Sequence, residues 1–114
     1  MENLEMEYKF RIIKDEKKVF GEGPCILLEE IDKLGSLSKA CEQLNMSYSK
    51  GWSIINNAEK ILGYELLETQ TGGIDGGGSH LTQNARKLIK AYRAYCAEAE
   101  EVLQELFKKY FREL

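Results

Sequence analysis

Few side chains of this sequence have the types and the spacing that metal binding requires. The cysteines Cys25, Cys41 and Cys96 are far apart and form no CxxC pair, and His80 is the only histidine. Zinc sites draw on cysteine and histidine ligands that come in closely spaced pairs. Separated thiols in odd number are instead typical of reduced cysteines packed as small apolar side chains. The sequence therefore predicts no metal site and no cofactor.

The glycine-rich segment TQTGGIDGGGSHLT, residues 69–82, is a candidate phosphate-binding loop. Five of the seven residues 72–78 are glycine. A P-loop needs a lysine and then Ser or Thr after its last glycine, and a dinucleotide-binding loop joins a strand to a helix. GGIDGGGS lacks the lysine and lies between two strand-like segments, ELLETQT and SHL. No carboxylate pair or Ser/His/Asp set is evident beside it, so we expect that the protein is not an enzyme.

Hydrogen-bonding side chains along one predicted helix indicate a different chemistry, the contact of a protein helix with DNA. In SYSKGWSIINNAEK, residues 47–60, the face opposite the apolar stripe carries no acid, whereas a solvated face more often mixes Glu with Lys. A helix fits the major groove, and its N-terminal side chains can reach base edges. The backbone amides at the same end can hold a phosphate. This polar face consists of Ser49, Lys50, Ser53, Asn56, Asn57 and Lys60.

Length and charge are compatible with this interpretation. The 114 residues fit one domain, and the net charge of −3 argues only weakly against a nucleic-acid partner, because the local distribution matters more. Residues 86–93 carry four cations and no acid, whereas residues 22–32 carry four acids and no base. No apolar run approaches the ~20 residues that cross a bilayer, and MENLEMEY does not resemble a signal peptide. We therefore expect a cytoplasmic protein without a membrane partner.

The N-terminal third is predicted to hold two strands and a helix. EYKFRIIK alternates apolar and polar residues, and KVF after the polar KDEKK is the predicted return strand, both within residues 7–20. Pro24 fits the first position of a helix, and Gly35 is placed to end it. Apolar residues recur between them at helical spacing: Ile26, Leu27, Ile31 and Leu34.

Two helices joined by a tight turn follow within residues 36–62. Ser36 can cap the first and Ser47 the second, and Asn45 between them tolerates a left-handed backbone. Gly63 is placed to end the second helix. The inward face of the first helix is Leu37, Ala40, Cys41 and Leu44. The apolar stripe of the second is Trp52, Ile55, Ala58, Ile61 and Leu62.

The last helix, residues 83–114, is predicted to be longer than one domain can cover. Thr82 can cap it, after a short strand at residues 79–81. A helix of ~30 residues is about 45 Å long, so its distal part needs a partner, such as a second copy of the chain. Apolar residues alternately four and three apart form the packing seam: Ala85, Ile89, Tyr92, Cys96, Ala99, Leu103, Leu106 and Tyr110.

Three motifs in order together resemble one family. They are GSLSKAC in the first helix of the pair, MSYSKGW in the second, and TGGIDGGGSHLT before the long helix. From about Phe20 to Tyr92 the sequence is similar to the N-terminal DNA-binding domain of the ModE family of molybdate-responsive transcription regulators, which resembles the helix-turn-helix of LysR-type regulators. The resemblance implies a mainly α fold with small β. It would be a winged helix-turn-helix with N-terminal strands over residues 1–82, its wing at 66–81, and a long dimerisation helix over 83–114.

The resemblance also implies a function and the residues that perform it. It implies a homodimer that binds an inverted repeat in double-stranded DNA and regulates transcription, with a link to molybdate transport or metabolism. The residues that would contact DNA are Ser36, Ser38, Ser47, Tyr48, Ser49, Lys50, Ser53, Asn56 and Asn57. Those of the wing are Thr71, Gly72, Gly73, Gly76, Gly77, Gly78, Ser79 and His80. Those of the dimer interface are Tyr92, Cys96, Ala99, Leu103, Leu106 and Tyr110.

The sequence departs from the family pattern at several places. The wing often carries a basic residue, but Ile74 and Asp75 occupy its tip here. Gly51 replaces the usual alanine before the tryptophan, which would cost an exposed helix about 1 kcal/mol. We expect no molybdate-binding domain in this chain, so any oxyanion sensing would need another site or another protein. The net negative charge and the acidic tip keep an alternative open: a winged-helix module that binds proteins and has no sequence-specific DNA binding.

Overall fold

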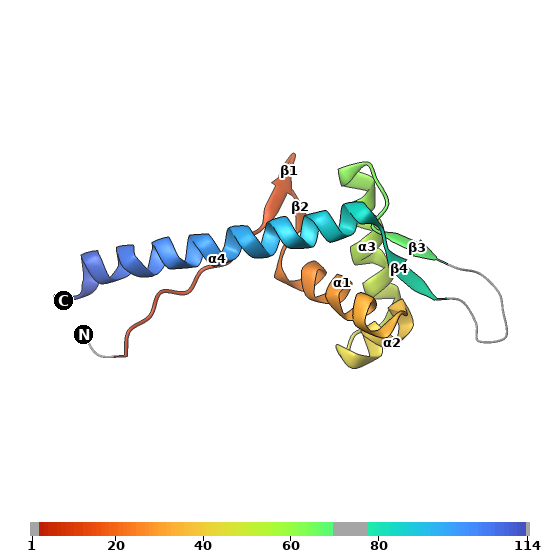
Figure 1. Ribbon diagram of the computed structural model, residues 1–114, viewed down its shortest axis with the longest axis horizontal. Coiled ribbons are helices and arrows are strands. Elements are labelled where there is room, and N and C mark those ends of the chain that lie inside the picture. Colours follow the sequence, from red (N-terminus) through yellow and green to blue (C-terminus); the bar gives the residue numbers. More distant parts are fainter. Residues whose placement is uncertain (1–2, 70–77, 114) are drawn as a thin grey trace.

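The computed structural model describes residues 3–69 and 78–113, which form four helices and two small antiparallel sheets (Figure 1). This mainly helical architecture confirms the predicted fold class. The helix-turn-helix, the wing strands and the long last helix follow in the expected order. The elements are β1 (Ile12–Lys14), β2 (Lys17–Phe20), α1 (Glu22–Leu34), α2 (Leu37–Gln43), α3 (Tyr48–Leu62), β3 (Leu67–Thr69), β4 (Ser79–Leu81) and α4 (Gln83–Phe111).

Side-chain caps begin three of the helices where the sequence predicts them. The hydroxyl of Ser36 accepts from the amide of Lys39 at 3.2 Å and begins α2. The hydroxyl of Ser47 accepts from Lys50 N at 3.1 Å and begins α3, and that of Thr82 does the same for α4. Each cap satisfies an amide that has no partner within its helix. Between α2 and α3, Asn45 has φ of 56°, which gives the tight turn.

Helix α1 ends as predicted but begins earlier. Gly35 closes it with φ of 72°, and Gly63 closes α3 with φ of 81°. The first residue of α1 is Glu22, so Pro24 is the third residue of the helix and not the first. The first four amides of a helix have no intrahelical partner, so proline is tolerated throughout the first turn. The composition of that turn therefore does not fix the starting residue.

The N-terminal strand is shorter than predicted. The β1–β2 hairpin is confirmed, but β1 begins only at Ile12, and the preceding residues follow α4 instead of a strand. Tyr92 of α4 donates its hydroxyl to the carbonyl oxygen of Phe10 at 2.9 Å, and Gln104 donates to the hydroxyl of Tyr8 at 3.4 Å. Tyr8 and Phe10 are half-buried and Lys9 is exposed. The alternation that predicts a strand thus reflects an extended segment packed on a helix.

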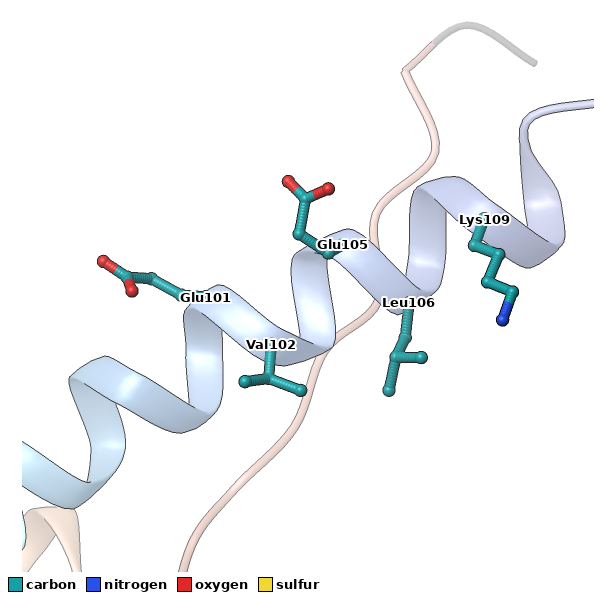
Figure 2. A pocket seen from close by; sticks show the side chains of 5 residues that line it. All are labelled: Glu101, Val102, Glu105, Leu106 and Lys109. Carbon is teal, nitrogen blue, oxygen red and sulfur yellow. The ribbon is translucent and has the colours of Figure 1, made fainter.

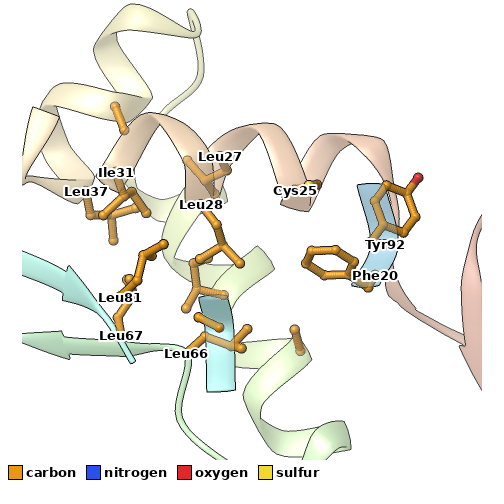
Figure 3. Packing of buried hydrophobic residues seen from close by; sticks show 14 of the residues in the cluster. Phe20, Cys25, Leu27, Leu28, Ile31, Leu37, Leu66, Leu67, Leu81 and Tyr92 are labelled. Carbon is orange, nitrogen blue, oxygen red and sulfur yellow. The ribbon is translucent and has the colours of Figure 1, made fainter. Parts of the chain in front are cut away.

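The core lies where α1 is enclosed by β2, α2, α3, the base of the wing and the proximal part of α4 (Figure 3). The ring of Phe20 meets the ring of Tyr92 edge to face, with 5.3 Å between their centres. All three cysteines are buried and reduced, and burial raises the pKa of the Cys25 thiol to about 11. The largest fully buried side chains are Phe20, Leu27, Leu28, Ile31, Leu66, Cys25 and Cys41.

The two oppositely charged segments of the sequence meet across α1 and α4. Arg86 of α4 forms a two-pronged pair with Asp32, with N–O distances of 2.8 and 3.1 Å. Arg93 donates to Glu29 at 2.6 and 3.1 Å and to Glu22 at 2.9 and 3.0 Å. The clustered arginines of α4 therefore orient α4 on α1. The acids of α1 and the arginines of α4, which lie far apart in the sequence, therefore form ion pairs with each other in the fold.

Beyond this contact, α4 extends away from the body of the molecule. The molecule measures 63 × 29 × 22 Å, and the distal half of α4 forms the long end in Figure 1. The described N-terminal segment runs beside it, as the contact between Tyr8 and Gln104 shows. Within the described residues, no helix is both long and apolar enough to span a bilayer.

Candidate nucleic-acid interface

The N-terminal end of α3 presents a cluster of exposed polar side chains. Tyr48, Ser49, Lys50 and Ser53 are all exposed, and Tyr48 retains 56% of its accessible surface. Ser47 uses its hydroxyl as the helix cap and lies 3.4 Å from the hydroxyl of Ser49. The cap fixes the first turn, so these side chains project from a rigid helix end.

Helix α3 has one buried face and two flanks that contact different hairpins. Gly51, Ile55 and Ala58 are the buried residues. On one flank Asn57 reaches the β1–β2 hairpin, and on the other Glu59 reaches the wing. The face opposite the core, around Ser49 and Ser53, remains open to solvent. Helix α3 is thus held at both flanks, and its outer face is free.

The hairpin flank includes a cleft of about 290 Å³. Asn57 Nδ2 donates to the carbonyl oxygen of Lys18 at 3.5 Å, and Lys14 Nζ donates to that of Ile61 at 3.4 Å. The amide of Asn57 therefore faces β2, and Asn56 is half-buried. The cleft is lined by Lys18, Val19, Gly23, Pro24, Met46, Lys50, Ile54 and Asn57.

The wing flank is attached to α3 through one carboxylate. Glu59 Oε2 accepts from the amide of Leu66 at 2.7 Å and from that of Leu67 at 3.3 Å. Thr82 donates its hydroxyl to the carbonyl oxygen of Glu65 at 2.8 Å. Trp52 lies seven residues, or about two turns, before Glu59 and so shares this flank. It is 51% exposed, so the prediction that Trp52 lies in the apolar stripe of α3 is wrong.

The base of the wing is a short antiparallel ladder that contacts the turn between α1 and α2. Glu68 pairs with His80, which is exposed, and Ser79 is buried. The amide of Ser79 donates to the carbonyl oxygen of Gly35 at 3.0 Å. A Cβ at Gly78 would lie 3.1 Å from the same oxygen, so glycine permits the approach. Five predicted wing residues and the two predicted tip residues lie outside the described residues: Thr71, Gly72, Gly73, Gly76, Gly77, Ile74 and Asp75.

Helix α2 contributes one exposed hydroxyl and one capping hydroxyl. Ser36 is half-buried as the cap, whereas Ser38 and its neighbour Lys39 are exposed.

Among the described residues, no group of His, Cys, Asp or Glu side chains could hold a metal ion.

Comparison with known families identifies this arrangement. Residues 26–86 match the family model described as bacterial regulatory helix-turn-helix protein, lysR family. The matched range includes α2, α3, the wing strands and the start of α4. The chain belongs to the lysR family of bacterial regulatory helix-turn-helix proteins.

Within this lysR-type family, several curated relatives carry the name ModE, in agreement with the three motifs. The transcriptional regulator ModE of Yersinia pestis is 32% identical over 89 residues, which cover 78% of this chain and 32% of the relative. The DNA-binding transcriptional dual regulator ModE of Escherichia coli is 35% identical over 81 residues, 70% of this chain and 31% of the relative. The chain thus spans about a third of the length of these relatives.

Two solved structures share the fold of this lysR-family chain. ArgP from Mycobacterium tuberculosis superposes with a TM-score of 0.51 at 22% identity, over 75% of this chain and 30% of that one. A variant of ZitR from Lactococcus lactis gives 0.54 at 18% identity, over 98% of this chain and 75% of that one. At these identities the likeness supports the fold alone.

The predicted dimer residues of this lysR-family chain divide into two groups. Tyr92 and Cys96 are buried in the core of their own chain, with 5% and 8% exposure, which leaves little of their surface for a second chain. Ala99 and Leu103 are half-buried, and Leu106 and Tyr110 are exposed. Figure 2 shows Val102 and Leu106 on one side of α4, with Glu101 and Glu105 on the other. The apolar side of the distal helix is therefore uncovered in the single chain.

Two exposed residues, Trp52 of α3 and Lys18 of β2, were not predicted as site residues. Trp52 was assigned to the apolar stripe by its spacing, and periodicity alone does not tell whether a residue beside the stripe is covered. Its position four residues after Tyr48 places both on one flank, which is the signal that could have indicated exposure. Lys18 has no such signal, because only the folded hairpin brings it beside Lys50.

Proposed function

We propose that this chain is a sequence-specific DNA-binding regulator of transcription that inserts α3 into the major groove. One observation carries the proposal: α3 exposes Tyr48, Ser49, Lys50 and Ser53 at its N-terminal end, and residues 48–57 include no acid. A phosphate-rich partner favours such a surface, even on a protein of net charge −3. The lysR-family helix-turn-helix supplies the frame that presents it.

In the proposed complex, the side chains and the backbone of α3 have separate roles. Ser49 and Ser53 would donate to or accept from base edges, and Lys50 would contact a guanine or a phosphate. The amides at the start of α3 would hold a phosphate beside Ser47. Ser36 and Ser38 at the start of α2 would contact the neighbouring backbone. Asn56 and Asn57 would contribute less, since one is half-buried and the other bonds to β2.

We also propose that two copies of the chain act together on an inverted repeat. The distal part of α4 carries an apolar side that the single chain leaves uncovered, around Leu106 and Tyr110. Two recognition helices related by two-fold symmetry would enter successive major grooves, about 34 Å apart. The wings, through the glycines and through Thr71 and His80, would approach the adjacent backbone. Such a regulator acts where the DNA is, in the cytoplasm.

The relatives named ModE motivate a further proposal, a link with molybdate transport or metabolism. Selection of bound fragments from the host genome tests it through the position of the sites. Enrichment beside a molybdate-transport operon supports the link, and enrichment only at unrelated genes contradicts it.

Replacement of Lys50 by alanine tests the proposed role of α3. A duplex selected from random sequences by the wild-type protein is the probe, and affinity is measured at moderate salt. We expect Lys50→Ala to weaken binding by about 1–3 kcal/mol, the size of one good side-chain contact to a base. Lys108→Ala, with the same charge loss on distal α4, should have little effect.

Two results would contradict the proposal. One is unchanged affinity of Lys50→Ala with the oligomeric state intact, which would remove Lys50 from the interface. The other is a selection that enriches no duplex at all. That second result would favour a protein-interaction module built on the same fold.

A further inference from the structure

Lys18 of the β1–β2 hairpin lies beside the recognition helix although 32 residues separate it from Lys50 in the sequence. Both lysines line the cleft between β2, the start of α1 and α3. We propose that Lys18 contacts a DNA backbone phosphate, so that the hairpin extends the DNA-binding surface on the flank of α3 opposite the wing. This inference rests on the proposed function, because it needs α3 to lie in a groove.

The backbone of Lys18 is fixed relative to α3. Its carbonyl oxygen accepts from Asn57 Nδ2 at 3.5 Å. The next two residues, Val19 and Phe20, are buried with 3% and 0% exposure and anchor the end of β2 in the core. At the other end of the hairpin, Lys14 donates to Ile61 at the end of α3 at 3.4 Å. The side chain of Lys18 is exposed, and its Cε lies over Gly21. With the backbone held, binding would reorient this side chain alone, which lowers the ordering cost.

The charge of the cleft favours an anion. Lys18 and Lys50 are its charged lining residues, and no carboxylate lines it. Glu22, which directly precedes the lining residue Gly23, is held by Arg93 at 2.9 and 3.0 Å and so is paired within the chain. Within this cleft the two lysines meet no carboxylate, which suits phosphate oxygens. Lys18 also lines the adjoining cleft, where Glu22 and Glu100 are among the lining residues.

The arrangement on the two flanks of α3 explains why a DNA backbone would reach this cleft. Glu59 ties α3 to the wing on one flank, and Asn57 ties it to the β1–β2 hairpin on the other. A helix in the major groove has a phosphate backbone on each side. The wing would meet one backbone, and Lys18 together with Lys50 would meet the other. Such a contact positions the protein without reading sequence.

Replacement of Lys18 by glutamine tests the contact, with Lys17→Gln as the matched control. Both lysines are exposed neighbours in β2, and glutamine keeps most of the aliphatic stem while removing the charge. The probes are the duplex selected by the wild-type protein and a scrambled duplex, each titrated at several salt concentrations. Lys18→Gln should weaken both by a similar factor, about three-fold to ten-fold, and lower the slope of log affinity against log salt by about 1. Lys18→Arg, which keeps the positive charge, should bind both duplexes as the wild type does.

Three results would overturn the inference. Unchanged affinity and slope for Lys18→Gln would remove the contact, and an equal loss in Lys17→Gln would show a general charge effect. A loss for Lys18→Gln on the selected duplex alone would indicate base reading in place of a phosphate contact. Wild-type binding of the selected duplex separates these outcomes from a failure of the proposed function, in which no variant binds. Urea unfolding of each variant confirms that the hairpin still folds.

Discussion

At the scale of single residues, Gly51 shows how packing overrides helix propensity. In the resembling family an alanine usually occupies this position, and helix propensity predicts that glycine there lowers the stability of an exposed helix by about 1 kcal/mol. The structure corrects this expectation: Gly51 is buried, and a Cβ there would overlap the sulfur of Cys41 on α2. The glycine lets α2 and α3 approach closely, and this contact sets the geometry of the helix-turn-helix. Gly51 and Cys41 are therefore matched in size.

We accordingly expect Gly51→Ala to destabilise the protein although alanine is the better helix former. Propensity favours alanine by about 1 kcal/mol, whereas overpacking a buried contact costs about 1–3 kcal/mol. The measurement is the free energy of unfolding in urea. Cys41→Ala, added to Gly51→Ala, should recover part of the loss, because it removes the overlapping sulfur. A Gly51→Ala protein more stable than the wild type would contradict the matched pair.

Residue-level predictions from the sequence were correct where the cause is local and incomplete where it is tertiary. The caps Ser36, Ser47 and Thr82 were predicted because each acts within its own first turn. Trp52 was misplaced because its exposure depends on which neighbours cover the edge of the stripe. For the same reason Ile26 and Leu34, predicted on the apolar face of α1, are each 37% exposed.

At the scale of elements, Glu59 is the main side-chain attachment of the wing to α3. Its carboxylate accepts from two consecutive amides, Leu66 and Leu67, at the point where β3 begins. Both residues are buried in the core, so water cannot readily replace the lost acceptor. The carboxylate therefore fixes the direction in which the wing leaves the recognition helix.

Glu59→Ala should destabilise the protein by about 1.5–3 kcal/mol, the range for hydrogen bonds that involve a charged group. Urea unfolding measures the loss, and hydrogen exchange should show faster exchange of the Leu66 and Leu67 amides. Glu42→Ala, at an exposed glutamate of α2, serves as the control and should change stability little. Equal stability of the two variants would show that water satisfies the two amides after all.

The order of elements could be predicted from the sequence, but their contacts could not. Turn and cap residues mark the helix pair, the wing strands and α4, and the ModE-like motifs fall on them in order. The basic segment 86–93 and the acidic segment 22–32 did not indicate which elements contact each other. Arg86 and Arg93, conspicuous as a basic cluster, are paired with acids of α1, which the sequence shows only as a separate cluster. The exposed cations Lys50 of α3 and Lys18 of β2 stand out less in the sequence than the cluster from Arg86 to Arg93.

At the scale of the whole molecule, the long end of α4 is the feature that the single chain does not explain. The proximal part is secured by Tyr92 in the core and Arg93 on α1. The distal part retains exposed apolar side chains, with Val102 at 60% and Tyr110 at 64% exposure. A second copy of the chain would cover them and would set the distance between two recognition helices. The proposed dimer and the proposed operator symmetry thus depend on the same surface.

A single charge on this surface should separate dimer formation from folding. Leu106 lies among the apolar residues of distal α4 and outside the core, so Leu106→Glu should leave thermal unfolding of the monomer cooperative. Burying an unpaired carboxylate between two chains is costly, so sedimentation equilibrium should show a monomer. Its affinity for a two-half-site duplex should fall to that for a single half-site. Lys108→Gln, an equal charge change on an exposed residue two positions away, should remain dimeric. A Leu106→Glu protein that stays dimeric would place the interface elsewhere.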